Sequence, residues 1–549
     1  MGEWQEDARC AHQKQVPCCA RNDNKKSKSN TQCKNRNVGV LLISSLSLLV
    51  SCRQPLRDAH DGWGQERATV HFLIESSPNN LDLRQGTDSQ SERIGELIYE
   101  PLVRKDDHFN LQPWLASSWE RPDALTWVFH LRGGVRFHDG KAMSAEDVVW
   151  SIESMTNGEV ISAKGGAFAD VTGVTVRDPL TLVVATKKPD ESLLFNLSDG
   201  LFGVVERGAG RDEGLHPVGT GPFRFVSQVQ DKEVVVERNE GYWGGAPKIE
   251  RVQFEVVPDN ITTALEMKKG SGDVESNVLT LDMVHALQGK RGLVVETGAG
   301  ARVDYANFNV NDPALRDKRV RQAIACAINK DALIAALWRG RAQPAETLLP
   351  AGHWAAAQQA ELPQYPHDVA RAVRLLEAAG LKPDKDGVRL RFTLKTSNDE
   401  TTRLEAQAIQ AQLREAGIAL TLRSAEFGTF YSDITKGAFQ MYMLRWIGSN
   451  EDPDIFRYAY ATESFPPKGA NRGRYSNARV DALLKAAGTE TDVGVRRREY
   501  VEEQQILADE LPGIPLWYPD NVVVHSSRLT GVTLNAGGSF DFLRTAELR

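Results

Sequence analysis

Residues 390–446 read LRFTLKTSNDETTRLEAQAIQAQLREAGIALTLRSAEFGTFYSDITKGAFQMYMLRW. Short apolar runs alternate here with longer amphipathic ones, which predicts strands at 390–394, 418–422 and 440–446 and helices at 402–416 and 427–436. Gly417 and Gly437 stand where each helix would end, a position that favours glycine. The repeated strand-helix-strand order predicts a parallel sheet with helices on its faces, and hence an α/β fold.

The neighbouring sequence continues this pattern. Asp317 and Asn329 each precede an apolar helical stretch and are predicted N-caps, and Ser144 with Asp147 predicts a capping box. Further helices are predicted at 91–99 and 367–379, and further strands at 70–74, 233–238 and 249–257. Cys326 falls in the apolar stretch after Asp317 and is predicted to be a small core residue.

Length and composition narrow the class of protein. A chain of 549 residues exceeds what one hydrophobic core organises, so at least two lobes are expected. Hydrophobic residues make up 41% and charged residues 25%, as in soluble globular proteins. Residues 1–51 hold eight Lys/Arg and four Asp/Glu, a charge of +4, so the total of −7 leaves −11 for the remainder. An acidic body argues against a nucleic-acid partner.

The N-terminal region carries an export pattern. The apolar run at 38–50 is shorter than the roughly 20 residues of a spanning helix, and basic residues precede it, as in a signal peptide. A buried core strand is the alternative. The run ends in Leu49-Val50-Ser51-Cys52, which looks like a bacterial lipobox, so Cys52 is the predicted lipidation site. We therefore expect a signal peptide at 1–51, with 1–33 consistent with a translation start placed too far upstream, and a tether at 52–67.

Several short blocks follow one another along the rest of the chain. They are YEPLV at 99–103, LRGGVRFHDGK at 131–141, GTGPF at 219–223, NEGYW at 239–243, NFN at 307–309, VRQAI at 320–324, WIGSNEDP at 446–453 and LP at 511–512. In their order and spacing they resemble the bacterial extracellular solute-binding proteins of family 5, the dipeptide/oligopeptide/nickel group. The resemblance covers residues 68–549.

This resemblance implies a two-lobed periplasmic-binding-protein clamshell of type II that closes over its ligand. Lobe 1 would comprise 68–305 plus 519–549, with an extra subdomain near 104–215, and lobe 2 would comprise 306–518. The implied function is the substrate-binding lipoprotein of an ABC importer, which captures peptides and delivers them to a membrane permease and ATPase complex. The resemblance implies a monomer in the cell envelope, held to the membrane by Cys52, without cofactor or metal.

The loop after the predicted strand 440–446 is the main candidate site, because ligands of α/β sheets bind beyond the carboxyl ends of strands. In peptide-binding relatives an Asp three residues after the Trp pairs with the peptide's α-amino group; here Ser449 takes that place. The anchoring charge is then missing or displaced to Glu451 or Asp452. Trp446 would form a cleft wall and Asn450 would contact ligand. The alternatives are core packing for Trp446 and a chain turn for Asp452.

Four further residues are candidates through the same resemblance. Thr87 and Asp88 fall where relatives contact ligand backbone, and Asn309 lies where the chain is expected to cross between lobes. Lys395 is the nearest basic residue to the position that holds a peptide carboxylate in relatives. The alternatives are turn residues for Thr87 and Asp88 and a solvated surface side chain for Lys395.

Two other functions remain open. The same fold can bind a non-peptide solute, such as an oligosaccharide, an opine or a metal chelate, and Ser449 motivates this alternative. An envelope hydrolase is the other. The sequence contains no Gly-x-Ser-x-Gly, His-Glu-x-x-His or Cys-x-x-Cys pattern, so no catalytic residue is predicted. His138, in the Gly-rich block at 131–141, is assigned to a strand with tight turns.

Overall fold

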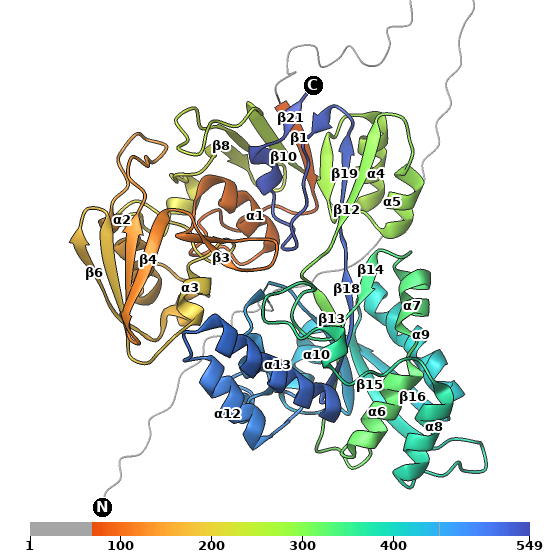
Figure 1. Ribbon diagram of the computed structural model, residues 1–549. Helices are drawn as coiled ribbons and strands as arrows, with labels where there is room; N and C mark the ends of the chain where they lie inside the picture. The colour runs from red at the N-terminus through yellow and green to blue at the C-terminus, as the bar shows by residue number, and fades with distance from the viewer. Residues whose placement is uncertain (1–68, 449–450) are drawn as a thin grey trace, which may run out of the picture. The chain divides into compact units, whose positions relative to one another are not determined.

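The computed structural model describes residues 69–448 and 451–549, whose strands form two main sheets (Figure 1). The first sheet has seven strands, in the spatial order β12 (Leu293–Gly298), β19 (Asn521–Ser526), β11 (Val274–Ser276), β1 (Thr69–Ile74), β10 (Arg251–Val256), β9 (Glu233–Arg238) and β8 (Phe223–Val229). The second has six, in the order β14 (Ala342–Pro344), β18 (Gly513–Pro519), β13 (Val303–Phe308), β17 (Met441–Trp446), β15 (Leu390–Ser397) and β16 (Ile418–Ala425).

The first sheet is organised around β1. All six residues of β1 are buried, and the strand pairs in parallel with β10 and β11. Phe72 packs its ring 5.2 Å from Phe254 and 4.4 Å from Phe540, so the C-terminal segment completes this core. The helices of this lobe include α1 (Ser89–Ile98), α4 (Asn260–Lys269) and α5 (Leu281–Leu287).

A separate antiparallel sheet carries its own core in the first lobe. It has the order β4 (Ala116–Asp123), β5 (Thr126–Leu131), β7 (Thr181–Thr186) and β6 (Val171–Asp178), with α2 (Ala145–Thr156) and α3 (Ser192–Asn196) beside it. The predicted capping box of α2 is confirmed, because the Asp147 carboxylate accepts a hydrogen bond from the Ser144 N–H at 2.8 Å. Short pairs join β2 (Val103–Lys105) to β3 (Leu111–Pro113), and β20 (Leu529–Thr530) to β21 (Glu547–Leu548).

The second sheet confirms the alternation at 390–446 and adds strands of the opposite sense. β15 runs parallel to both β16 and β17, as the sequence predicts, with α9 (Glu400–Glu415) and α10 (Phe427–Thr435) between them. Gly417 and Gly437 adopt φ of +75° and +76°, which explains why glycine follows each helix. β13 pairs antiparallel with β17 and β18, so the complete sheet is mixed rather than parallel.

The remaining helices of the second lobe are α6 (Lys318–Ala327), α7 (Lys330–Leu337), α8 (Val369–Ala378), α11 (Ile455–Tyr460), α12 (Ala478–Ala487) and α13 (Val493–Glu510). Asp317 and Asn329 cap α6 and α7 as predicted, by accepting from the N–H groups of Arg319 and Ala332. Cys326 is fully buried in the core of this lobe, also as predicted.

The chain passes between the two main sheets twice. It leaves the first sheet after Gly298 and enters the second at Val303, and it returns between Pro519 and Asn521. β13 and β18 therefore lie side by side at the junction (Figure 1). The described fold is the predicted α/β, two-lobed class. Within the described residues, no helix has both the length and the apolar character needed to cross a bilayer.

Candidate functional site

A cavity of about 800 Å³ lies between the two lobes. Volumes of roughly 300–1,000 Å³ are typical of small-ligand sites. Its walls on the first lobe come from α1 and from the segments 105–109, 195–201, 277–282 and 535–539. The second lobe contributes the end of α7, the first turns of α9 and the segment after β17. The cavity thus has one wall on each lobe.

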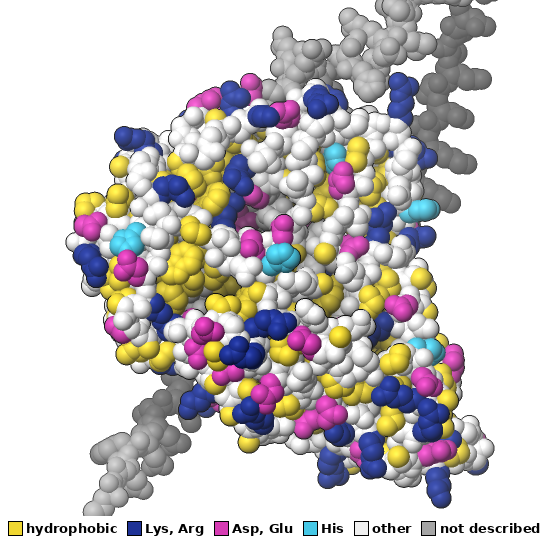
Figure 2. Space-filling model, viewed as in Figure 1, with side chains coloured by type: hydrophobic (Ala, Val, Ile, Leu, Met, Phe, Trp, Pro, Cys, Tyr) yellow, Lys and Arg dark blue, Asp and Glu magenta, His cyan; other side chains and the backbone are white. Residues whose placement is uncertain are grey.

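Carboxylates outnumber basic groups in this cavity. The acidic lining residues are Glu92, Glu96, Asp106, Asp107, Asp199, Asp282, Glu400, Glu405, Glu451 and Asp520, and the basic ones are Arg93, Lys105, Arg302 and Arg445. On the outer face shown in Figure 2, by contrast, acidic and basic side chains are interspersed. The excess of carboxylates favours a ligand that carries positive charge.

Glu451 is paired across the cavity. Its carboxylate lies 2.7 Å from the Nζ atom of Lys105, which belongs to β2 of the first lobe; the Glu451 side chain is buried and that of Lys105 is partly buried. Burial alone would lower the pKa of Lys105, but Asp199 and Glu451 raise it above its ordinary value. The backbone oxygen of Glu451 also lies 3.0 Å from Nε2 of His353. The Glu451 carboxylate therefore already has a charged partner within the protein.

Asp452 is buried at the start of the turn into α11. Its carboxylate accepts a hydrogen bond from the N–H of Asp454 at 3.0 Å. Burial and the charge of Asp454 raise the pKa of Asp452 to about 6. These contacts are those of a residue that shapes the turn. Ser449 and Asn450 lie outside the described residues.

Trp446, at the end of β17, is half-buried between two aromatic side chains. It stacks on Tyr305 with ring centroids 5.8 Å apart, and Tyr458 meets it edge-on at 6.2 Å. Its Nε1 atom has no hydrogen-bond partner. The cavity wall is formed by the neighbours Arg445 and Ile447 rather than by Trp446 itself.

The other four predicted site residues make local contacts and do not line the cavity. Asp88 caps α1 by accepting from the N–H groups at 90 and 91, and Thr87 accepts from the Asn79 amide at 2.9 Å. Lys395 forms an ion pair with Asp433 at 2.7 Å. The Asn309 amide donates to two backbone oxygens of the 437–439 turn. Their roles in ligand binding stay predictions.

Two lining carboxylates have strongly shifted pKa values. Burial and the charge of Asp199 raise the pKa of Glu96 to about 8. Burial and the charge of Asp304 raise the pKa of Glu405 to about 8, although Arg302 acts in the opposite direction. No described residue forms an ion pair with either side chain. Unpaired carboxylates with raised pKa values at a cavity are candidates for ligand contact.

The sequence of this chain matches a known protein family. Residues 110–468, more than half of the chain, match the model of the bacterial extracellular solute-binding proteins, family 5 middle region. The chain belongs to this family. The predicted membership is thus confirmed.

Individual relatives cover nearly the whole molecule. The glutathione-binding protein GsiB of Salmonella paratyphi A is 28% identical over 486 residues, 86% of this chain and 93% of that protein. The crystal structure of NikZ from Campylobacter jejuni with Ni(L-His) is 25% identical, with a TM-score of 0.71, over 88% of this chain and 99% of the other. The DppA protein of Helicobacter pylori, in complex with the peptide STSA, is 25% identical with a TM-score of 0.69, over 87% and 98%.

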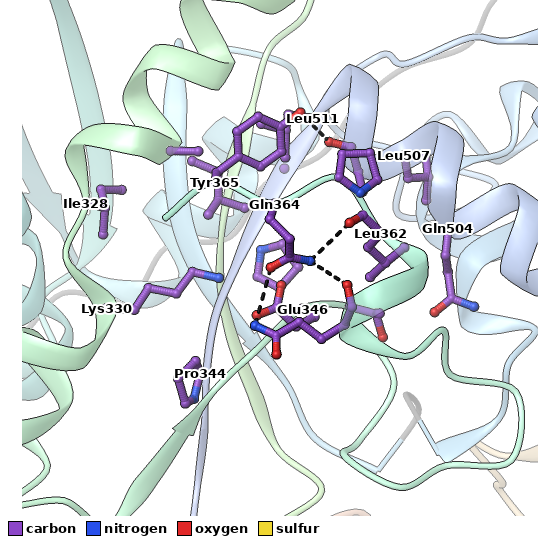
Figure 3. Close-up of a pocket in the computed structure, with 18 of the residues that line it drawn as sticks. Ile328, Lys330, Pro344, Glu346, Leu362, Gln364, Tyr365, Gln504, Leu507 and Leu511 are labelled. Carbon is purple, nitrogen blue, oxygen red and sulfur yellow. Dashed lines mark hydrogen bonds between the residues drawn. The ribbon is translucent and has the colours of Figure 1, made fainter. Parts of the chain in front are cut away.

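This family-5 protein has a second cavity, of about 300 Å³, within lobe 2 alone (Figure 3). Its residues lie between 325 and 515, so movement of one lobe against the other does not enclose it. The Lys330 Nζ atom donates to the backbone oxygen of Ala345 at 2.6 Å, and burial lowers the pKa of Lys330. The Gln364 amide donates to two backbone oxygens of 359–362, as Figure 3 shows. The interlobe cavity is larger and is lined by both lobes, so it is the stronger candidate.

Sequence reasoning missed the cavity residues on α9 and before β13. Glu405 stands inside a regular helix and Arg302 precedes a strand, and neither position forms part of a recognisable motif. One signal was available, because Glu405 interrupts the otherwise apolar or small face formed by Ala406, Ile409 and Leu413. Among the described residues, no group of His, Cys, Asp and Glu side chains is arranged to hold a metal ion.

Proposed function

We propose that the protein captures a short peptide in the interlobe cavity and presents it to the permease and ATPase of an ABC importer. The cavity of about 800 Å³ with one wall on each lobe is the observation that carries this proposal. Apolar side chains such as Leu404 and Ile447, both partly exposed in the cavity, can contact peptide side chains. GsiB is named for glutathione and DppA was crystallised with a peptide, which supports the same ligand class.

The proposal includes the lobe boundaries predicted from the sequence, 68–305 plus 519–549 and 306–518. The change of sheet at 299–302 and at Asp520 lies close to these boundaries. Two rigid lobes joined by two short connections can close over a ligand by small rotations at the connections. The protein itself would bind and release its solute without a chemical step.

A peptide panel tests the ligand class. Thermal unfolding of the purified protein is followed with di- to tetrapeptides, glutathione, oligosaccharides and nickel-histidine. A ligand at 100 times its Kd stabilises by about 2.7 kcal/mol, which raises the melting temperature measurably. We expect peptides to give the largest shift. A shift with nickel-histidine or a sugar and none with any peptide would transfer the proposal to a non-peptide solute, for which the NikZ complex with Ni(L-His) is the motivating observation.

We also propose that Cys52, which lies outside the described residues, anchors the protein to the cell envelope after removal of 1–51. Several acyl chains at one cysteine give firm membrane attachment, at about 0.8 kcal/mol per buried methylene. Cys52→Ala should move the protein from the membrane fraction to the soluble fraction of cells. Cys33→Ala is the matched control and should leave the distribution unchanged. Membrane attachment of the Cys52→Ala protein would contradict lipidation at this residue.

A further inference from the structure

Glu405 is a buried carboxylate that faces the interlobe cavity without a partner. Its side chain belongs to α9, and the residue is 2% exposed. Its Oε1 atom has no hydrogen-bond partner. Thr401 and Leu404, one helical turn before it, line the same cavity, so this face of α9 is directed at the ligand space.

The two cations beside Glu405 are already held by other carboxylates. Arg302 donates to both oxygens of Asp304, at 2.8 and 2.6 Å. Arg445 donates to Asp399 at 3.1 Å and to the hydroxyl of Thr402 at 2.8 Å. Each guanidinium is therefore balanced before Glu405 is counted. When Glu405 is ionised, these two arginines face three carboxylates, so the cluster carries one excess negative charge.

A buried acceptor without a partner is an unusual feature in a folded protein. Polar groups shielded from water are nearly always hydrogen-bonded, because desolvation without a partner is unfavourable. Across the same cavity wall, Trp338 presents an indole N–H that also has no partner. The Arg302 guanidinium covers the Trp338 ring at 5.5 Å. Two residues of the wall therefore hold a buried acceptor and a buried donor that no other described group of the protein uses.

A ligand ammonium group matches Glu405 in charge and in hydrogen bonding. It carries one positive charge and up to three N–H donors, and a charge-assisted bond to a carboxylate is about twice as strong as a neutral one. We propose that Glu405 accepts the ammonium group of the captured solute, so that the protein selects peptides with a free amino group. This inference rests on the proposed function and specifies the chemistry of its ligand.

The environment of Glu405 predicts how binding depends on pH. The charged groups that face it are Arg302 and Asp304 at β13, Arg445 on β17 and Asp399 at the start of α9. Burial, with the charge of Asp304, raises the pKa of Glu405 to about 8, so the empty site holds a proton at pH 6 and releases it when an ammonium group binds. Affinity should then rise about tenfold per pH unit between pH 5 and 7. It should level off near pH 8, where a peptide α-amino group loses its own proton.

The experiment offers the purified protein a mixed library of di- to tetrapeptides and the same library after N-acetylation. Retained peptides are identified by mass spectrometry after rapid gel filtration, and the affinities of the best ones are measured at pH 5, 6 and 7. We expect the wild-type protein to retain free-amine peptides in at least tenfold preference. Glu405→Gln should lose that preference and the dependence on pH.

Glu400→Gln is the matched control. Glu400 lines the same cavity from the first turn of α9, but its side chain is exposed, so its replacement removes one cavity carboxylate without touching the buried acceptor. We expect this variant to keep the preference for free-amine peptides and the pH dependence. If both variants lost the preference for free-amine peptides equally, the preference would come from the overall negative charge of the cavity, and the role of Glu405 would be overturned.

The two proposals fail in distinguishable ways. Equal retention of free and acetylated peptides by the wild-type protein would overturn the role of Glu405 and leave peptide capture intact. Retention of neither library would overturn both. Unchanged selectivity in Glu405→Gln, with a melting temperature no lower than that of the wild type, would also overturn the inference.

Discussion

Two carboxylates in the same cavity have opposite surroundings. Glu451 lies 2.7 Å from Lys105 of the other lobe, whereas Glu405 has an unpartnered oxygen and no ion pair. Both are almost completely buried. The comparison separates two uses of a buried acid: one joins the lobes through a completed charge pair, and the other leaves its bonding capacity for a group from outside.

The difference has an energetic consequence for the empty protein. A paired buried carboxylate keeps its charge because its partner compensates for the loss of water. An unpaired one takes up a proton instead, and the raised pKa of Glu405 is this response to burial. The empty protein therefore tolerates Glu405 mainly as a neutral acid, and the ligand supplies the charge that Lys105 supplies to Glu451.

The largest expected difference between Glu405 and Glu451 lies in how the free energy of unfolding depends on pH. Burial raises the pKa of Glu405 from 4.5 in the ordinary case to about 8, so the folded state binds its proton more tightly than the unfolded state does. The contribution of Glu405 to the free energy of unfolding is most favourable below pH 4.5 and is lost progressively as the pH rises toward 8. By pH 7 the loss is on the order of 3 kcal/mol. Glu405→Gln should remove this decline.

The measurement is urea unfolding of the ligand-free protein at pH 5, 6 and 7. Glu96, with its pKa raised to about 8, contributes a similar decline in every variant, so the difference between wild type and Glu405→Gln isolates Glu405. Glu400→Gln should retain the wild-type slope. Identical slopes for Glu405→Gln and the wild type would mean that Glu405 is ionised and paired, and the contrast with Glu451 would disappear.

Much of the fold was predictable because it depends on local patterns. The alternation at 390–446 predicted the parallel strands β15, β16 and β17, and the glycines that end two helices were found where glycine's positive φ is needed. The antiparallel strands β13 and β18 were not predictable from this segment, since they arrive from distant parts of the chain. Local sequence determines elements, whereas mixed sheets depend on long-range pairing.

The candidate site was less predictable for the same reason. The resemblance directed attention to the loop after β17, and Ile447, Gly448 and Glu451 of this loop do line the cavity. Whether a carboxylate is paired, however, depends on side chains far away in the sequence: Lys105 is 346 residues from Glu451. No spacing rule reveals such a pair. The unpartnered state of Glu405 is likewise visible only once Arg302 and Arg445 are seen bonded to other acids.

Glu451→Gln tests the contrast between Glu451 and Glu405 through a smaller expected change in stability. It leaves the partly buried Lys105 ammonium without its nearer carboxylate partner, although the Asp199 carboxylate remains 4.0 Å away and the Asp199 backbone oxygen still accepts from Lys105 at 3.2 Å. A hydrogen bond to a charged group contributes about 1.5–3 kcal/mol, so we expect the free energy of unfolding at pH 7 to fall by about 2 kcal/mol. Glu463→Gln is the control, because Glu463 is an exposed carboxylate 3.8 Å from Arg457, and an exposed pair of this kind contributes below about 1 kcal/mol. If Glu451→Gln lowers the free energy of unfolding no more than this control does, the pair with Lys105 does not hold the lobes together. Glu451 and Glu405 then differ less than their surroundings indicate.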